Sequence, residues 1–355
     1  MGDVAMTVPV VYSLAKQYPE LRITVLSQKF ARPFFEHMPH NVGFMEADLK
    51  HEYHGVKGLN ALFRRLVAKN FTAVADLHDV LRSKYLRMRF NISRYKVAHI
   101  DKHRTDRHAI TAQNGKDLRQ LHTSFENYAD VFATLGYPVS VDFNSIYPDG
   151  KGDLSKLPTA FVNTIAKRYN ETGIVKRGDD TWIGIAPFAA HKGKIYPTEM
   201  MEKVINILLT KHPQSKIFLF GGGKKETDIM RRWSESNPAI INASAQVGGI
   251  ANELILMSHL DVMISMDSSN MHLASLVGTP VVSVWGATHP FAGFMGWKQD
   301  PDDAVMLDLP CRPCSIYGNK LCSRGNYPCM TGITPEMITG RVEIQLLKSK
   351  KDISR

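Results

Sequence analysis

The sequence contains no apolar run of the about 18 residues that a membrane-spanning helix needs. Its first residues also lack the charged stretch followed by an apolar segment that marks a secretory leader. A content of 44% hydrophobic and 22% charged residues is that of a globular protein, and 355 residues suffice for two domains of ordinary size. We therefore expect a cytoplasmic protein with two domains.

Complete phosphate- and nucleic-acid-binding motifs are also missing. The glycines at 221–223 follow an expected strand, but the spacing of a dinucleotide or Walker motif is not present. The net charge of +10 suits an anionic partner, and nine Lys or Arg lie between Arg82 and Arg107 against only Asp101 and Asp106. Without a readout motif or interleaved aromatic residues, we do not expect nucleic acid as the partner. A solvated helix face and a surface for an anionic substrate both remain open for this cluster.

Cysteine is scarce, and all of it lies in one short segment. The four residues are separated by two, seven and six residues, and they are Cys311, Cys314, Cys322 and Cys329. A reducing cytoplasm disfavours disulfides. One C-x-x-C pair with two further cysteines is compatible with a tetrahedral zinc site, although the second pair lacks the usual spacing. A candidate structural zinc site and a loop of free thiols therefore both remain open.

The most informative segment that is present runs from Asp261 to Pro290. It predicts a buried strand at 262–264, a polar turn at 266–270, a helix from Met271 to Val277 and a second strand at 280–285. Such a unit belongs to a parallel sheet, in which ligands gather at the carboxyl ends of the strands. The polar turn would then open a helix N-terminus, where a phosphate is stabilised. Simple helix capping by Asp267 or Ser268 is the alternative.

Strands and helices alternate along both halves of the chain, which predicts an α/β protein with two doubly wound, Rossmann-like domains facing a cleft. Residues 139–153 are rich in Asp, Pro, Gly and Ser and form the best linker candidate, followed by one more helix from Ser155 to Glu171. We accordingly expect an N-terminal domain over 1–174, a C-terminal domain over 175–334, and a final helix and tail over 335–355.

Three short motifs in the central segment follow one another in a fixed order. They read Asp-Ser-Ser-x-x-His-Leu-Ala, Leu-x-Gly-Thr-Pro-Val-Val and Trp-Gly-Ala-Thr-x-Pro. This run resembles the donor-site signature of the ADP-heptose:lipopolysaccharide heptosyltransferases, glycosyltransferase family 9. The resemblance implies the GT-B arrangement of two Rossmann-like domains, with the nucleotide sugar on the second and the acceptor on the first.

The resemblance also implies roles for residues of the second domain. Lys194 matches the lysine of the family's Lys-x-Trp-Pro motif, which binds the donor phosphates, and would stabilise the departing diphosphate. The expected donor-binding residues are Lys192, Glu226, Leu254, Asp267, Ser268, Ser269, Asn270 and His272. Since lysine and backbone amides would carry the phosphate charge, and no Asp-x-Asp motif is suitably placed, no metal cofactor is expected in catalysis.

In the first domain, the opening Met-Gly-Asp-Val is similar to the family's turn before its first helix. The resemblance implies that Asp3 is the general base, and that the chain lacks the strand that precedes this turn in the family. The family's acceptor side binds an anionic sugar, for which guanidinium and ammonium groups are suited. The expected acceptor-binding residues are Arg82, Lys102, Arg104 and Arg107.

These expectations combine into one function. The chain would be an inverting glycosyltransferase that moves heptose from ADP-heptose to an anionic lipopolysaccharide-core acceptor, in the cytoplasm or on the cytoplasmic face of the inner membrane. Two alternatives remain: a GT-B transferase that uses a UDP- or GDP-linked sugar, and a non-catalytic two-domain protein that binds a small anion. The sequence does not predict the oligomeric state.

Overall fold

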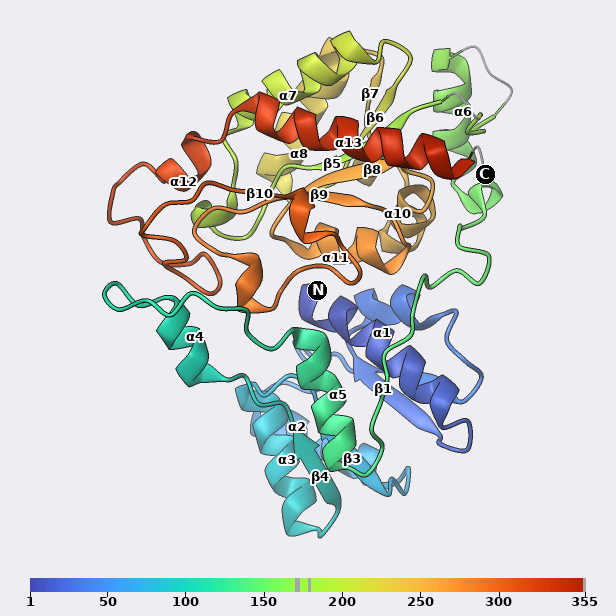
Figure 1. Cartoon of the computed structure of the whole chain (residues 1–355). Coiled ribbons are helices and arrows are strands. Elements are labelled where there is room, and N and C mark those ends of the chain that lie inside the picture. Colours follow the sequence, from blue (N-terminus) through green and yellow to red (C-terminus); the bar gives the residue numbers. More distant parts are fainter. Residues whose placement is uncertain (170–172, 178–179, 354–355) are drawn as a thin grey trace. The chain divides into compact units, whose positions relative to one another are not determined.

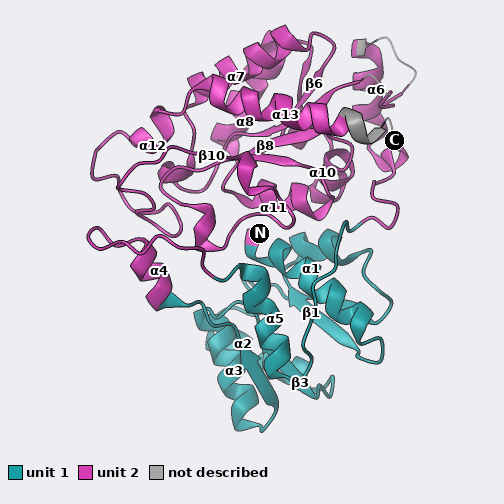
Figure 2. Ribbon diagram, viewed as in Figure 1, with its two compact units in different colours: residues 1, 3–104, 122–146 teal, residues 2, 105–121, 147–355 magenta. Residues whose placement is uncertain are grey.

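A computed structural model of the chain describes residues 1–169, 173–177 and 180–353. The described residues form two compact α/β units (Figure 2). Unit 1 comprises residue 1 and residues 3–104 and 122–146, and unit 2 comprises residue 2 and residues 105–121 and 147–355. Residues 147–174 thus group with the second unit by their contacts, while the domain boundary at 174/175 stays a prediction.

Unit 1 contains two pairs of parallel strands and the helices that connect them (Figure 1). Strand β1 pairs with β2, and β3 pairs with β4. The elements, in chain order, are α1 (Gly2–Gln17), β1 (Ile23–Ser27), the 3-10 helix η1 (Lys29–Phe35), β2 (Val42–Glu46), α2 (Gly55–Val67), β3 (Ala73–Asp76), α3 (Leu81–Ile92), β4 (Lys96–His99) and α5 (Ser124–Thr134). Helix α4 (Arg104–Ile110) lies almost entirely in the segment that groups with unit 2.

Local sequence signals explain where these helices form. Apolar residues recur in α2 at the spacing of one helix face, and Leu59, Leu62 and Leu66 are buried. Helix α5 begins with a capping box, in which the Thr123 hydroxyl accepts a hydrogen bond from the Glu126 amide and the Glu126 carboxylate accepts one from the Thr123 amide. Helix α2 packs against α3, and α5 contacts both β3 and β4.

Unit 2 is built on one parallel sheet with the strand order β10-β9-β8-β5-β6-β7. The strands are β5 (Trp182–Ala186), β6 (Lys216–Leu219), β7 (Ile240–Asn242), β8 (Val262–Met266), β9 (Val281–Val284) and β10 (Ala304–Val305). The α-helices are α6 (Thr159–Tyr169), α7 (Thr198–Lys211), α8 (Lys224–Ser236), α9 (Ala243–Gln246), α10 (Ile250–Met257), α11 (Ser269–Leu276), α12 (Pro328–Thr331) and α13 (Pro335–Ile353). The short 3-10 helices are η2 (Leu154–Lys156), η3 (Lys192–Lys194), η4 (Pro290–Ala292) and η5 (Pro301–Asp303).

The central strands of this sheet are buried along their whole length, as expected for a parallel sheet covered on both faces. Helices α7 and α13 pack against each other, and α13 also packs on β8 and β9. Helices α10 and α11 also pack together, and α11 contacts the same two strands. Figure 1 shows α7 and α13 on one side of the sheet and α10 and α11 on the other. This is the doubly wound arrangement that the alternating elements predict.

Two expectations change once the structure is described. The basic stretch from Arg82 to Arg107 is not one solvated helix face, because it contains α3, the strand β4 and the start of α4. The helix expected over 155–171 is shorter and begins at Thr159, after η2; position 171 lies outside the described residues. Among the described residues, no helix is both long and apolar enough to cross a membrane.

Helix α13 offers a matched test of how the core of unit 2 is stabilised. Leu346 is 4% exposed and belongs to the buried cluster, whereas its neighbour Leu347 is 61% exposed. We expect Leu346→Ala to lower the free energy of unfolding by about 2–5 kcal/mol, because it leaves a cavity, and Leu347→Ala to change it by less than about 0.5 kcal/mol. Urea unfolding followed by tryptophan fluorescence measures both. Equal losses would show that α13 does not pack on the sheet in this register.

Candidate functional site

The sheet of unit 2 reverses its strand order at β5. Strands β6 and β7 follow on one side of β5, and β8, β9 and β10 follow on the other. Where the order reverses, the connections after two neighbouring strands leave on opposite faces and open a crevice at the carboxyl edge. The loops after β5 and β8 therefore border the natural ligand site of this unit.

Two predicted residues meet at this point. The ammonium group of Lys194, in η3 after β5, lies 3.3 Å from the carboxylate of Asp267, which directly follows β8. Both side chains are largely buried, at 15% and 7% exposure. The register of β5 and β8 pairs Ala186 with Ser265, so the two loops start side by side. The structure thus joins Lys194 and Asp267, which are 73 positions apart in the sequence.

Helix α11 begins at Ser269, two residues after Asp267, and points its N-terminus to the same edge. Ser268 occupies the N-cap position, but its side chain makes no capping hydrogen bond, and Ser268, Ser269 and Asn270 are half-buried. The simple capping role considered for Ser268 is therefore not what the structure shows. The first amides of the helix and a nearby lysine are a combination that stabilises phosphate. His272 is buried in the first turns of α11, and Lys192 is exposed.

Close packing between three loops holds the lysine in position. The Gly193 carbonyl accepts a hydrogen bond from the Ala287 amide at 2.8 Å. A Cβ atom on Gly193 would lie 2.8 Å from the Ala287 side chain and 2.9 Å from the carbonyl oxygen of Gly318. A Cβ on Gly318, whose φ is +74°, would lie 2.4 Å from the aliphatic chain of Lys194. Only glycine allows these approaches, which fix where Lys194 emerges.

The other expected donor contacts are Glu226, in the first turn of α8, and Leu254, on α10. The Glu226 carboxylate accepts a hydrogen bond from the Gly222 amide at 2.8 Å, so it is tied to the glycine turn. The Ser244 hydroxyl accepts one from the Gly221 amide at 3.1 Å. Leu254, on α10, is only 1% exposed and packs into the interior of the unit.

One acidic residue near this loop escaped the sequence analysis. Glu253 is half-buried at the side of α10, and burial raises the pKa of its carboxyl group, while a hydrogen bond with Ser244 opposes that shift. Because Ser244 also accepts from Gly221, Glu253 is linked through one hydroxyl to the glycine turn. The available signal was a single charged residue in the mostly apolar segment Ile250–Met257. Perturbed carboxyl groups beside a ligand-binding edge are candidates for ligand contacts.

Unit 1 presents a second group of polar residues. Asp3 lies in the first turn of α1, and its carboxylate, 65% exposed, is 3.8 Å from Nε2 of His78 in the turn after β3. The hydroxyl of Tyr128, on α5, donates a hydrogen bond to the backbone carbonyl of Asp3 at 3.3 Å. An exposed carboxylate beside an imidazole, on an anchored helix N-terminus, can accept a proton from a bound hydroxyl.

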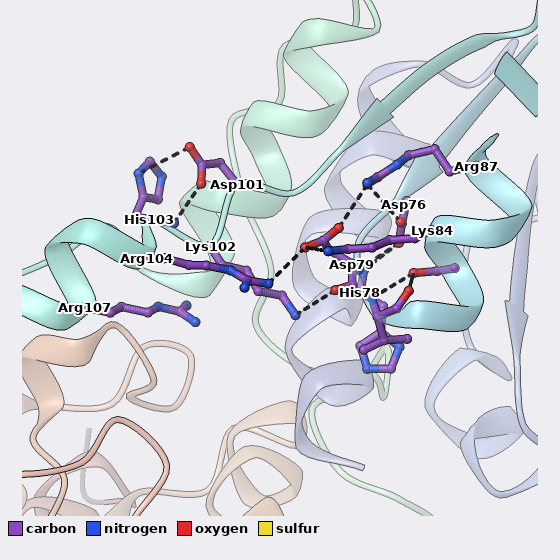
Figure 3. A network of polar contacts seen from close by, with 12 residues as sticks. Asp76, His78, Asp79, Lys84, Arg87, Asp101, Lys102, His103, Arg104 and Arg107 are labelled. Carbon is purple, nitrogen blue, oxygen red and sulfur yellow. Dashed lines mark hydrogen bonds and ion pairs between the residues drawn. The ribbon is translucent and has the colours of Figure 1, made fainter.

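Asp79 is the centre of the ionic network shown in Figure 3. Its side chain is only 12% exposed, and its backbone φ is +46°, which is unusual for a residue with a Cβ. Lys84, Arg87 and Arg104 lie within 3.2–3.6 Å of its carboxylate, and Lys102 donates to its backbone carbonyl. Desolvation works against ionisation, but the neighbouring cations prevail and hold the pKa of Asp79 below its usual range.

The four predicted acceptor residues therefore have different settings. Lys102 and Arg104 meet at Asp79, whereas Arg82 is exposed at the second position of α3. Arg107 groups with unit 2, where it donates to the Tyr317 hydroxyl at 2.9 Å and lies over the Phe294 ring at 4.9 Å. The structure thus does not unite the four residues in one cluster of unit 1.

The cysteine segment contains four free thiols, of which Cys329 is buried and the others are half-buried. Burial raises the pKa of Cys329 to about 11, which favours the protonated thiol. Within the described residues, no three His, Cys, Asp or Glu side chains are grouped closely enough to hold a metal ion. The arrangement gives the candidate zinc site no support.

Comparison with known proteins decides the family. The sequence profile of glycosyltransferase family 9 (heptosyltransferase) matches residues 59–323, about three quarters of the chain. The chain belongs to glycosyltransferase family 9. As the sequence motifs predicted, it is a glycosyltransferase.

Curated relatives of this family-9 chain include lipopolysaccharide heptosyltransferase 3 of Escherichia coli strain K12. It is 24% identical over 301 residues, which cover 81% of this chain and 80% of the relative. Lipooligosaccharide heptosyltransferase 2 of Haemophilus influenzae is 24% identical over 297 residues, which cover 82% of each chain.

Solved structures show that the family-9 chain has the GT-B-like fold of these enzymes. A family-9 glycosyltransferase from Veillonella parvula matches with a TM-score of 0.69 and 20% identity, covering 98% of this chain and 95% of that one. The Escherichia coli heptosyltransferase WaaC, solved with ADP, matches with a TM-score of 0.64 and 17% identity, covering 97% of each chain. The expected fold class is confirmed.

The packing around Gly193 leads to a prediction for this transferase. Gly193→Ala should displace η3 and with it Lys194, because the new Cβ meets atoms that belong to two other loops. We expect a loss of transfer activity of about tenfold or more, as for other small displacements of positioning groups. Gly222→Ala is the matched control, because a Cβ there meets nothing within 4 Å. Steady-state kinetics would compare both variants, and an unchanged Gly193→Ala enzyme would refute the role of this packing.

His289 gives a prediction for the effect of pH on stability. Burial, with Arg312 nearby, lowers the pKa of His289 from 6.5 to about 4, and its Nδ1 accepts a hydrogen bond from the Phe291 amide. Since the unfolded chain binds this proton more readily, stability should fall as the pH drops from 6.5 towards 4, by about 3 kcal/mol.

Urea unfolding at a series of pH values measures this dependence. His289→Asn retains an acceptor for the Phe291 amide and should flatten the stability profile between pH 6.5 and 4. His40→Asn, at an exposed position, is the control and should leave the slope unchanged. A steep profile that survives in His289→Asn would place the acid-sensitive group elsewhere.

Proposed function

We propose that this chain transfers heptose from ADP-heptose to an anionic sugar of the lipopolysaccharide core, with inversion at the anomeric carbon. The observation that carries the proposal is the Lys194–Asp267 pair beside the N-terminus of α11, at the reversal point of the sheet. The relatives named above are lipopolysaccharide and lipooligosaccharide heptosyltransferases. One structural neighbour was solved with ADP and another with ADP-2-deoxy-2-fluoro heptose.

On the donor side, Lys194 and the amides of Ser268, Ser269 and Asn270 neutralise the charge that grows on the departing diphosphate. Asp267 then accepts hydrogen bonds from the hydroxyl groups of the sugar. In the free protein Asp267 is the partner of Lys194 at 3.3 Å, so both side chains are already at the site when the donor arrives. Glu226 contacts the ribose, Lys192 supports the phosphates from the loop surface, and His272 and Leu254 complete the donor site.

On the acceptor side, Asp3 is the general base. Its carboxylate takes the proton from an acceptor hydroxyl, the hydroxyl oxygen forms a bond to the anomeric carbon, and the bond from that carbon to the diphosphate breaks. The electron pair of the broken bond leaves with ADP. The acidic groups of the acceptor are bound by the basic side chains of Arg82, Lys102, Arg104 and Arg107. This division assigns the acceptor to residues 1–174 and the donor to residues 175–334.

The chemistry also suggests where the reaction takes place. A nucleotide-sugar donor belongs to the cytoplasm, and a lipid-linked acceptor belongs to a membrane surface. We place the enzyme in the cytoplasm, at the cytoplasmic face of the inner membrane, and assign it no required cofactor. The positive charge for the diphosphate comes, in this proposal, from the chain itself.

Calorimetric titration with ADP, UDP, GDP and ADP-heptose tests the donor. We expect adenine-selective binding that is weakened in Lys194→Ala, while Lys203→Ala, an exposed lysine on α7, binds normally. Preference for UDP or GDP would retain the fold and replace the donor. Absence of binding to all four compounds would refute transfer from a nucleotide sugar.

Single-turnover transfer to lipopolysaccharide-core acceptors tests the roles of the residues. Lys194→Ala and Asp267→Ala should each lower the rate about a hundredfold to a thousandfold. Asp3→Asn should lower the rate about a hundredfold to ten-thousandfold with unchanged affinity for ADP-heptose, as expected for loss of a general base. Near-normal turnover in Asp3→Asn would assign the base to another residue.

A further inference from the structure

Helix α3 has apolar residues on two opposite sides. On its inner side Phe90 is buried and packs edge-on against Phe63 and Tyr95, with ring centroids 5.0 and 5.1 Å apart. On its outer side Leu81 is 85% exposed, Met88 48% and Ile92 71%. A surface helix needs only the inner apolar side to fold, so the outer one calls for a separate explanation.

The exposed residues lie along a single line on the helix surface. They are separated by seven and four residues, spacings that return to almost the same angle at 3.6 residues per turn. Phe90 is two residues from both Met88 and Ile92, which places it on the far side of the helix. Single exposed apolar side chains are common on proteins, but an ordered line of them marks an interaction surface. We call Leu81, Met88 and Ile92 the outer stripe.

The surroundings of the outer stripe are strongly basic. Helices α2 and α3 contain seven Lys or Arg and no Asp or Glu between them. The two helices are joined where the Tyr85 hydroxyl donates to the Asn60 side chain at 2.9 Å. Lys57 and Arg64, three residues before and four after Asn60, lie on the same side of α2 and are exposed. Figure 1 shows α2 and α3 next to each other.

Not every one of these cations is available to a partner. Arg87 pairs with Asp76 and Asp79, and Arg89 lies over the Phe63 ring at 4.6 Å. The exposed basic residues of the two helices are Lys57, Arg64, Arg65, Arg82 and Lys84. Of these, Lys84 is the partner of Asp79 at 3.5 Å, while its side chain stays 43% exposed. Most of the positive charge beside the outer stripe therefore faces solvent.

An apolar line with basic flanks matches one kind of partner. Helices of this pattern lie in the plane of a bilayer, with their apolar side chains among the acyl chains and their cations at anionic headgroups. A second copy of the same face is disfavoured, because it would bring two basic surfaces together. Nucleic acid is disfavoured as well, since the aliphatic stripe offers no aromatic platform for bases.

We propose that α3 docks this enzyme on an anionic lipid bilayer, with the outer stripe inserted and the helix axis parallel to the membrane. The 12 residues of α3 form about 18 Å of helix, enough for all three stripe residues to enter together. Lys57, Arg64, Arg82 and Lys84 contact the anionic headgroups. The surface contains neither Asp3 nor Lys194, and Arg82 is the one residue that it shares with the proposed acceptor site.

The position of α3 gives the docking a consequence for the acceptor. The helix starts directly after the turn that contains His78 and Asp79, and His78 lies 3.8 Å from Asp3. Within unit 1, the docked helix therefore holds the candidate general base near the membrane surface. An acceptor anchored in that surface by acyl chains would reach the base without leaving the bilayer.

Vesicle flotation of the full chain, without substrates, tests the proposal. We expect the wild-type protein to float with vesicles of phosphatidylethanolamine and phosphatidylglycerol and to stay behind with phosphatidylcholine vesicles. The variant L81Q/M88Q/I92Q should bind the anionic vesicles about tenfold or more weakly, with an unchanged circular dichroism spectrum and thermal midpoint. Glutamine keeps the helix propensity of α3. The variant K57Q/R64Q should also bind about tenfold more weakly and should lose much of the salt dependence of binding.

The matched control replaces three exposed leucines of unit 2. L118Q/L321Q/L347Q removes side chains that are 44%, 88% and 61% exposed, and it should float like the wild-type protein. The proposal is overturned if the wild-type protein does not float, if it binds phosphatidylcholine equally well, or if the control loses as much binding as the stripe variant. It is also overturned if the stripe variant binds the anionic vesicles normally. If that variant at the same time lowers the mass measured by sedimentation, α3 joins two copies of the chain instead.

Discussion

The pairing of β5 with β8 is the constraint on which the donor side depends. These strands are neighbours in the sheet although about 75 residues separate them in the sequence, and their register sets the starting points of the two loops behind them. One loop delivers a lysine and the other a carboxylate followed by a helix N-terminus. A shift of that register by one residue would turn every side chain of the strand to the other face of the sheet. The ion pair of Lys194 with Asp267 is therefore a direct product of sheet geometry.

The acceptor side depends on a different kind of support. Asp79 is nearly buried and has a positive φ, and several cations stabilise it in this position. Desolvation alone would raise the pKa of Asp79 and favour the protonated carboxyl group. The neighbouring cations outweigh this effect and lower the pKa. Ion pairs thus hold the turn before α3 in place. The loop that contains Lys194 is held instead by close packing, which requires glycine at positions 193 and 318.

Much of the second half of the chain could be predicted from the sequence. Fully buried strands read as continuous apolar runs, and the polar turn between β8 and α11 was visible because its residue types change abruptly. The family was predicted from the same segment and is confirmed over residues 59–323. The catalytic and binding roles of Asp3, Lys194 and the other assigned residues stay predictions.

Other features could not be predicted because they depend on partners distant in the sequence. Arg107 was grouped with Lys102 and Arg104 for its charge, but its contacts are with Tyr317 and Phe294, about 200 positions away. Glu253 escaped notice because its perturbed pKa results from burial and from Ser244, neither of which a local pattern reports. The outer stripe of α3 could not be predicted, because apolar residues on two opposite sides of a helix remove the alternation of apolar and polar faces that a sequence pattern reports.

The chain passes from one unit to the other more than once. Residues 105–121 group with unit 2, although the segments before and after them belong to unit 1. Ile110 and Leu121 in that excursion are buried with Ala292, and the Leu121 amide donates to the Phe291 carbonyl. The two halves are therefore not modules that a single recombination event could exchange. A chimera joined after residue 146 would bring with its first half the segment 105–121, which packs in unit 2 of its original chain. Acceptor and donor specificity in such chains are thus expected to be inherited together.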